Sequence, residues 1–458
     1  MNYNDFLKTK EIRVLPSGFN VEEGKLNPAA FDWQRHVVSW ALKRGKAALF
    51  EDCGLGKTLQ QLMWAEQVCK YIKRPVLIVA PLAVSLQTKR EGEKFGIAVN
   101  ICESQANVRE GINITNYEKL EKFDATIFGG VVLDESSILK SYMGKTKRMI
   151  IEKFAYTPYK LACTATPAPN DLMELLNHAE FLGIMKSSEA LAIWFIADQS
   201  ESGKYRLKGH AEKDFWQWVS SWAVCIEKPS DIGYSDEGYI LPPLTEKDVT
   251  VGSSNALTAF EDIARQIETS ATGYHKERRR TLSDRCKETA RIVSSDQNQY
   301  VIWCGMNDEA DELKRLIPEA VEIRGCDKPE KKEKAAMDFI NGSIRVLISK
   351  PSIFGYGLNF QNCNKSVFCG MDYSFESYYQ AVRRFYRFGQ KKPVEIIRVL
   401  GDTEINILKT INRKTDMKEH MRHSMADTMR GFQTGSNVSF GLDLSKKTYD
   451  IPVWLKGA

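Results

Sequence analysis

The stretch EDCGLGKT, residues 51–58, decides the fold of this 458-residue chain. It follows a short apolar run at residues 47–50 and precedes a segment whose apolar residues recur at helical spacing through residues 62–72. Gly54 and Gly56 let the backbone approach phosphate oxygens closely, and the N-terminus of the following helix favours negative charge. The sequence therefore predicts a strand, a glycine loop and a helix that together bind the phosphates of a nucleotide.

The two residues that end this loop have separate expected roles. The ammonium group of Lys57 can reach the β- and γ-phosphates, and the hydroxyl of Thr58 can hold Mg²⁺. Glu51 stands where the general phosphate-loop pattern has its first glycine. The loop therefore fits the mechanism of a phosphate site, although it departs from the general motif at one position.

A second site lies downstream, where the apolar run Val131–Leu133 ends in Asp134 and Glu135. Buried parallel strands have this composition, and the carboxylates at their C-terminal ends face the crevice where ligands bind. We expect Asp134 to hold Mg²⁺ and Glu135 to orient and deprotonate the attacking water.

Composition and charge define the class of protein only broadly. Apolar residues make up 43% and charged residues 27% of the chain, and the formal net charge is +5, so any contact with nucleic acid must come from local patches. The ten cysteines contain no C-x-x-C pair, which argues against a zinc ribbon or a disulfide framework and favours a reducing cytoplasm. The N-terminus lacks an apolar signal segment, and no apolar run is long enough for a transmembrane helix.

The order of strand-like and helix-like runs indicates an α/β protein with two units of mostly parallel sheet. Aromatic residues crowd the stretch between these units, which we interpret as a small helical subdomain followed by a linker rich in Pro and Gly. The expected organisation is an N-terminal extension at 1–30, a first lobe at 31–185, a helical insertion and linker at 186–245, a second lobe at 246–430 and a tail at 431–458. A basic helix around residues 275–280 should open the second lobe.

The second lobe carries a polar stripe. Ser374 is a plausible helix N-cap, and beyond it Gln380, Arg384 and Arg387 are spaced at i, i+4 and i+7, which places them on one face of a helix. These side chains can point together at a neighbouring lobe. An arginine in that position can neutralise charge on the transferring γ-phosphate, an effect of roughly 10³–10⁵-fold in known NTPases. A solvated basic face is the alternative.

Together, these motifs resemble the superfamily-two helicases of the DEAD/DEAH-box type, specifically the SWI/SNF-like DNA translocases and their compact phage-encoded relatives. Residues 51–58 resemble the family's D-E-x-G-L-G-K-T, and residues 380–390 resemble its Q-A-x-x-R-x-x-R-x-G-Q. The resemblance spans roughly residues 31–400. It implies two RecA-like, doubly wound parallel-sheet lobes with a small helical insertion between them.

Further roles rest on the resemblance alone. Gln34 resembles the glutamine that reads adenine, and Gly357, in the stretch 355–359, resembles the glycine of the fifth motif. Residues 87–91 resemble a DNA-contact motif of the first lobe, and residues 164–167 resemble the coupling motif T-G-T-P. The resemblance implies ATP as substrate, Mg²⁺ as cofactor and DNA, duplex or branched, as a partner bound without sequence preference. The implied location is the cytoplasm, which for a phage protein is that of the host.

One departure leaves the function open to alternatives. Ser137 stands where the family has His or Asp, a residue that helps couple hydrolysis to lobe closure. The expected function is an ATP-dependent DNA translocase or helicase, that is, a DNA-stimulated ATP hydrolase. An RNA helicase and a non-translocating ATP-dependent switch are the alternatives. A dinucleotide-binding oxidoreductase is discounted, because no G-x-G-x-x-G follows an early strand.

Overall fold

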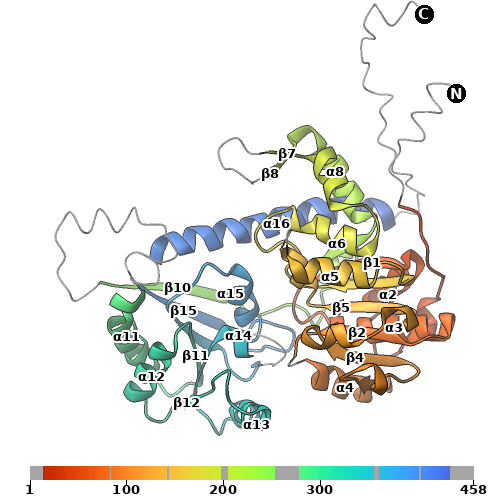
Figure 1. The fold of residues 1–458 in the computed structure, drawn as a ribbon. Helices are drawn as coiled ribbons and strands as arrows, with labels where there is room; N and C mark the ends of the chain where they lie inside the picture. Colours follow the sequence, from red (N-terminus) through yellow and green to blue (C-terminus); the bar gives the residue numbers. More distant parts are fainter. Residues whose placement is uncertain are drawn as a thin grey trace, which may run out of the picture.

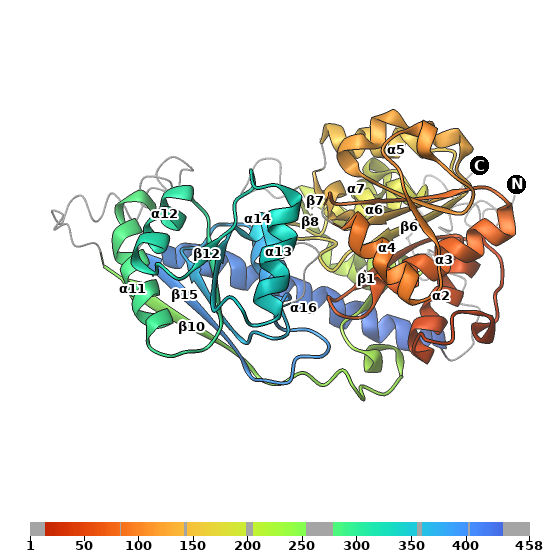
Figure 2. The same ribbon diagram turned by 90° about the horizontal axis from the view of Figure 1, so that it is seen from below.

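The computed structural model describes residues 14–82, 84–141, 144–197, 205–252, 278–354, 360–401 and 404–433. Figure 1 shows two lobes, one coloured from red to yellow and the other from green to blue. The long helix α16 (Ile405–Gln433) runs along both of them, and the view from below in Figure 2 agrees. The expected two-lobe α/β fold is confirmed.

The first lobe is built on a seven-stranded parallel sheet with the order β3-β4-β2-β5-β6-β1-β9. Its strands are β1 (Lys46–Glu51), β2 (Val76–Ala80), β3 (Val99–Ile101), β4 (Ile112–Asn116), β5 (Gly130–Asp134), β6 (Tyr159–Cys163) and β9 (Ala223–Ile226). Its helices are α2 (Asp32–Arg44), α3 (Lys57–Ile72), α4 (Ser85–Lys94), α5 (Lys145–Lys153), α6 (Glu174–Leu182), α7 (Ser187–Trp194) and α8 (Glu212–Ser220). Short 3-10 helices cover Glu23–Lys25, Gln105–Asn107, Tyr117–Lys122, Ala125–Ile127, Ser136–Lys140, Gly209–Ala211 and Pro229–Ile232.

Strand β1 shows why this sheet is covered on both faces. Successive side chains of a strand point to opposite faces, and every apolar residue of β1 is buried. Ala47 and Leu49 pack into the core cluster that contains α2 and α3, whereas Ala48 and Phe50 pack into the cluster that contains α6 and α8. A continuous apolar run is therefore the sequence of a strand buried between two helical layers.

The second lobe has a six-stranded parallel sheet with the order β10-β15-β14-β11-β13-β12. Its strands are β10 (Leu244–Val251), β11 (Tyr300–Cys304), β12 (Val321–Glu322), β13 (Val346–Ser349), β14 (Lys365–Cys369) and β15 (Val394–Gly401). Its helices are α11 (Leu282–Ser294), α12 (Asn307–Leu316), α13 (Pro329–Ile340), α14 (Pro351–Phe354) and α15 (Phe375–Val382). Residues 275–277 of the expected basic helix lie outside the described residues.

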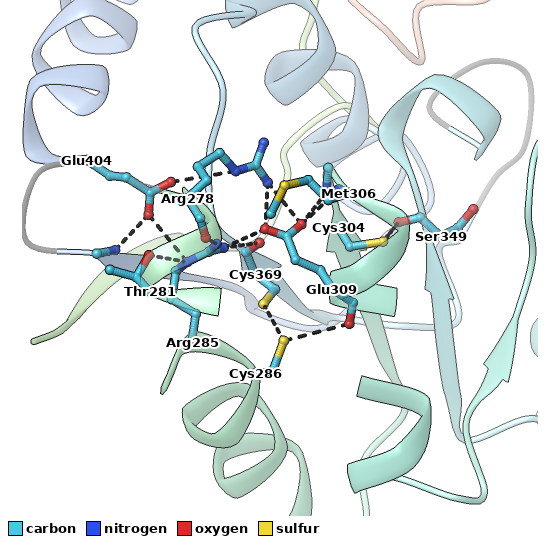
Figure 3. A network of polar contacts seen from close by, with 12 residues as sticks. Arg278, Thr281, Arg285, Cys286, Cys304, Met306, Glu309, Ser349, Cys369 and Glu404 are labelled. Carbon is cyan, nitrogen blue, oxygen red and sulfur yellow. Dashed lines mark hydrogen bonds and ion pairs between the residues drawn. The ribbon is translucent and has the colours of Figure 1, made fainter. Parts of the chain in front are cut away.

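A buried charge network joins the elements of the second lobe (Figure 3). Glu309 at the start of α12 accepts hydrogen bonds from Arg278 at 2.8 and 2.9 Å and from Arg285 at 2.8 Å. Glu404, just before α16, lies 3.7 Å from Arg285 and accepts from the Gly401 backbone at 2.7 Å. Because both carboxylates are almost fully buried, the network fixes the N-terminal end of α16 to this lobe.

The segment between the lobes differs from the expected helical insertion. It contains α7 and α8, but it also forms an antiparallel pair, β7 (Phe195–Ala197) with β8 (Tyr205–Leu207), and the strand β9. Strand β9 pairs with β1 in the first sheet, so this lobe continues to residue 226 rather than ending at 185. The sequence Ala223–Ile226 is short and apolar, and its pairing with β1 depends on contacts that are distant in the chain.

Helix α16 packs against both lobes. Its first turns, with Ile407 and Ile411, are buried in the core of the second lobe. Met421 and Met425 are buried in the core cluster of the first lobe that contains α8. The expected second lobe at 246–430 therefore ends in a helix that crosses to the first lobe. In the described part of the chain, no helix is long and apolar enough to cross a membrane.

Candidate active site between the lobes

The glycine loop lies between the end of β1 and the start of α3, which begins at Lys57. The Lys57 ammonium group donates to the backbone carbonyls of Glu51 at 2.8 Å and Asp52 at 2.9 Å. The loop therefore folds around the Lys57 side chain, and the N-terminus of α3 faces the space beside the loop. This is the geometry of a phosphate-binding loop.

Both glycines of the loop are required by their surroundings. Gly54 has φ = 90° and Gly56 has φ = 80°, values that side chains rarely tolerate. A Cβ atom on Gly54 would lie 3.2 Å from Cβ of Arg387 in the other lobe. On Gly56 it would lie 2.4 Å from Nε2 of Gln34. The two lobes therefore meet directly at this loop.

Gln34 lies against the loop and is already hydrogen-bonded within the protein. Its Nε2 donates to the Leu55 carbonyl at 2.8 Å, and its Oε1 accepts from the Phe31 backbone N–H at 3.0 Å. A carboxamide has two N–H groups and two lone pairs, so one of each remains for a ligand. The adenine-reading role of Gln34 stays a prediction.

The acidic pair stands at the carboxyl end of β5, beside the loop. Asp134 Oδ1 accepts from Gln61 Nε2 at 2.7 Å, and Thr164 Oγ1 donates to Glu135 Oε2 at 3.3 Å. Glu135 has φ = 53°, a left-handed conformation that is strained for a residue with a side chain. Burial, together with the neighbouring Asp134, raises the pKa of Glu135 to about 7. Such a carboxylate suits a general base near neutral pH.

The second lobe contributes the arginines, although not from one continuous helix. Ser374 caps α15 as expected, since its hydroxyl accepts from the Ser377 N–H at 3.2 Å. The helix ends at Val382, however, so Arg384 and Arg387 lie in the turns that follow it. The expectation of one helical stripe through Arg387 is wrong in this respect. The Arg384 carbonyl accepts from the Phe360 N–H at 3.0 Å instead of continuing the helix.

One cavity of about 520 Å³ brings these groups together. The first lobe lines it with Gly54, Gly56, Lys57, Thr58, Asp134 and Glu135, and the second lobe with Gln361, Arg384, Arg387 and Phe388. Burial and the neighbouring Arg384 lower the pKa of Arg387 to about 10. Gln87, Arg90 and Glu91 of α4, which belong to the stretch 87–91 that resembles a DNA-contact motif, also line this cavity.

The structure does not place two further candidate residues, Gln380 and Gly357, at the cavity. Gln380 is fully buried, and neither polar atom of its carboxamide has a hydrogen-bond partner within the described part of the chain. It is not among the residues that line the cavity. Gly357 lies outside the described residues, so its expected place at the nucleotide stays a prediction.

A contact between the lobes involves Ser137, the residue that departs from the family pattern. Its hydroxyl donates to Glu376 Oε1 on α15 at 2.6 Å, and both residues are buried. Lys140 pairs with the other oxygen of Glu376 at 2.5 Å. We call Ser137, Lys140 and Glu376 the interlobe latch. The hydroxyl at this position thus binds the opposing lobe.

Sequence reasoning missed several residues of the site. Gln61, which holds Asp134, lies four residues after Lys57 and therefore on the same face of α3, a spacing that could have identified it. Glu376 had no such signal, because its partner is 239 residues away. The phosphate loop, the acidic pair and the arginines thus lie in one interlobe cavity, and these are the groups that a nucleoside-triphosphate hydrolase site needs.

Comparison with known proteins agrees with this class. Residues 33–208 match the SNF2-related domain, and residues 284–389 match the helicase conserved C-terminal domain. The chain is 28% identical over 218 residues to the ISWI chromatin-remodeling complex ATPase ISW2 of Saccharomyces cerevisiae, a match that covers 42% of this chain and 19% of that protein. It is 26% identical over 177 residues to the ATP-dependent helicase brm of Drosophila melanogaster, covering 34% and 11%.

Among solved structures, the chain is similar to the Sulfolobus solfataricus SWI2/SNF2 ATPase core in complex with dsDNA. The identity is 18%, the TM-score is 0.43, and the match covers 89% of this chain and 96% of that one. The two matched domains lie in this order along the chain, the SNF2-related domain on the first lobe and the helicase C-terminal domain on the second. The matched segments span less than one fifth of the two curated relatives named above.

Proposed function

We propose that this protein hydrolyses ATP between its two lobes and uses the cycle to move on, or remodel, DNA. The observation that carries the proposal is the single cavity lined by Lys57 and Glu135 from one lobe and by Arg384 and Arg387 from the other. The matched SNF2-related and helicase C-terminal domains support it, as does the similarity to a chromatin-remodeling complex ATPase and to an ATP-dependent helicase.

The chemistry divides between the lobes. The phosphate loop binds the triphosphate through its backbone N–H groups and Lys57, while Glu135 orients a water molecule and accepts its proton. Arg384 and Arg387 neutralise charge that develops on the γ-phosphate. Because these arginines reach the cavity only when the lobes are together, hydrolysis requires the closed arrangement.

Thr58 and Asp134 would hold Mg²⁺. A hydroxyl and a single carboxylate suit this ion, which keeps several waters and completes its coordination with substrate phosphates. Gln61 donates to Oδ1 of Asp134 and leaves Oδ2 for the metal or its waters. Held there, Mg²⁺ would neutralise part of the charge on the phosphates.

The partner is proposed to be DNA, held mainly through its phosphates and without sequence preference. Closing and opening of the lobes would then advance the protein along its track. The RNA helicase and the non-translocating switch are the competing functions. The relation to phage-encoded members and the cytoplasmic location stay predictions.

Glu135→Gln tests the hydrolysis. The variant should bind ATP with unchanged affinity and lose nearly all turnover, whereas Glu152→Gln, which removes an exposed carboxylate of the same lobe, should match the parent protein. Normal turnover by Glu135→Gln would show that the base is a different group. The parent ATPase is then measured with single-stranded, duplex, forked and four-way DNA and with RNA. Stimulation of ATP hydrolysis by RNA but not by DNA would favour the RNA helicase. Translocation is measured as displacement of the third strand from a DNA triplex, and ATP hydrolysis without such displacement would favour the switch.

A further inference from the structure

Helix α16 reaches the first lobe through polar contacts as well as through its buried methionines. Nε2 of His420 lies 2.7 Å from Oε1 of Glu212 on α8. Lys414 donates to Asn170 Oδ1 at 2.9 Å, beyond the end of β6. The helix therefore lies along the first lobe for several turns, close to the interlobe cavity.

The most buried of these polar contacts form a chain of alternating charge. Arg422 pairs with Glu227 at 2.7 Å, Glu227 with Arg383 at 3.4 Å, and Arg383 with Asp52 at 2.6 Å. Lys418 ends the chain 3.8 Å from Asp52. We call these five residues the interlobe charge cluster. Lys418 and Arg422 are four residues apart and so share one face of α16, while the carboxylates come from the first lobe and Arg383 from the second.

Asp52 connects this cluster to the phosphate loop. Its side chain is 4% exposed, and it also accepts a hydrogen bond from the Tyr379 hydroxyl. Although burial raises its pKa, Arg383 and Lys418 hold the pKa of Asp52 at about 2, so the group is an anion. The backbone carbonyl of the same residue accepts from Lys57 Nζ.

Lys418 contacts both the hydroxyl and the ring of Tyr379. Its ammonium group donates to the Tyr379 hydroxyl and lies 3.7 Å from the centroid of that ring. Its side chain is only 19% exposed. A lysine buried to this extent loses hydration, so its position next to an anion and an aromatic face must offset that loss.

We propose that Lys418 is a positioning residue of the nucleotide site: by holding Asp52 together with Arg383 and Tyr379, it sets the phosphate loop in the arrangement needed for closed lobes. Within the described residues, Lys418 contacts Asp52 and Tyr379, which are not among the residues that line the cavity, so it acts through Asp52. Helix α16 is on this basis a third structural component of the site, beside the two sheets. The kinetic part of the test rests on the proposed ATP hydrolysis.

The first measurement does not depend on activity. Lys418→Met keeps the length of the side chain and removes its charge, and Lys409→Met is the matched control on an exposed position of the same helix. In hydrogen exchange, amides of residues 53–57 should exchange about tenfold faster in Lys418→Met, the change expected when one charged hydrogen-bond donor is lost. Amides within α3 should keep their parent rates, and Lys418→Arg should restore protection of the loop.

Kinetics provide the second measurement. In Lys418→Met, kcat for ATP should fall by about tenfold while KM stays within about twofold, because closure is impaired and binding to the first lobe is not. In a protein that already carries Asp52→Asn, the same substitution should have little further effect.

Each outcome decides the proposal. Parent-like protection of the loop in Lys418→Met, or equal changes in Lys409→Met, would overturn it. An undiminished effect in the Asp52→Asn background would also overturn it. If the parent protein hydrolyses no ATP, the proposed function fails, and the exchange data still decide the role of Lys418.

Discussion

Removal of the Ser137 hydroxyl should weaken lobe closure by a predictable amount. The hydroxyl donates to a buried carboxylate at 2.6 Å, and hydrogen bonds to charged groups contribute about 1.5–3 kcal/mol. The Lys140–Glu376 pair adds less, about 0.2–1 kcal/mol, because the Lys140 side chain is 44% exposed. Ser137→Ala should therefore cost the closed arrangement about 2 kcal/mol, which lowers the ratio of closed to open protein by about 30-fold.

The assay is DNA-stimulated ATP hydrolysis together with binding of a fluorescent ATP analogue. If the open arrangement dominates in the variant, kcat should fall by up to about 30-fold, while affinity for the analogue stays within about threefold. Ser141→Ala, which removes an exposed hydroxyl after the same 3-10 helix, is the control. Glu376→Gln keeps an acceptor for Ser137 but loses the charge, so it should cost about 1 kcal/mol.

The double variant Ser137→Ala/Glu376→Gln separates the latch from unrelated effects. If the two residues act through one hydrogen bond, the double variant should lose less than the sum of the two single losses. Parent values of kcat and KM in Ser137→Ala would refute the reasoning. Strict additivity would show that the contact between these residues does not carry the coupling.

Three further results are expected. Burial and Asp134 raise the pKa of Glu135 to about 7, so this base is protonated below that pH. The value of kcat/KM should therefore rise with pH and level off above about pH 7. A profile that is flat between about pH 6 and 8 would exclude Glu135 as the base. Gln380→Leu removes a buried amide without a hydrogen-bond partner in the described structure, an unfavourable burial of about 1–3 kcal/mol, so the melting temperature should not fall even if turnover is lost. Glu309→Gln leaves Arg278 and Arg285 without their shared anion. Calorimetry should show that the free energy of unfolding falls by about 3–5 kcal/mol and the melting temperature by about 10 °C. An unchanged melting temperature would contradict a structural role for this network.

The sequence predicted what depends on neighbours in the chain. Strand β1, the glycine loop and the start of α3 follow from one local pattern, and the acidic pair after β5 follows from another. The sequence did not predict that α15 ends at Val382, because the Arg384 carbonyl bonds to Phe360 instead of extending the helix. Likewise, β9 became a strand of the first sheet only by pairing with β1, and short apolar runs do not reveal their partners.

The position of the arginines therefore depends on contacts that no local pattern encodes. At one end of α15, Glu376 is held by the latch to the segment after β5. Just beyond its other end, Arg383 is held to Asp52 after β1. Both attachment points stand at the carboxyl edge of the first sheet, on strands that flank β6. A short helix fixed on both sides in this way places Arg384 and Arg387 over the phosphate loop only while both contacts persist, so loss of either one should uncouple the lobes even though every catalytic group remains in the chain.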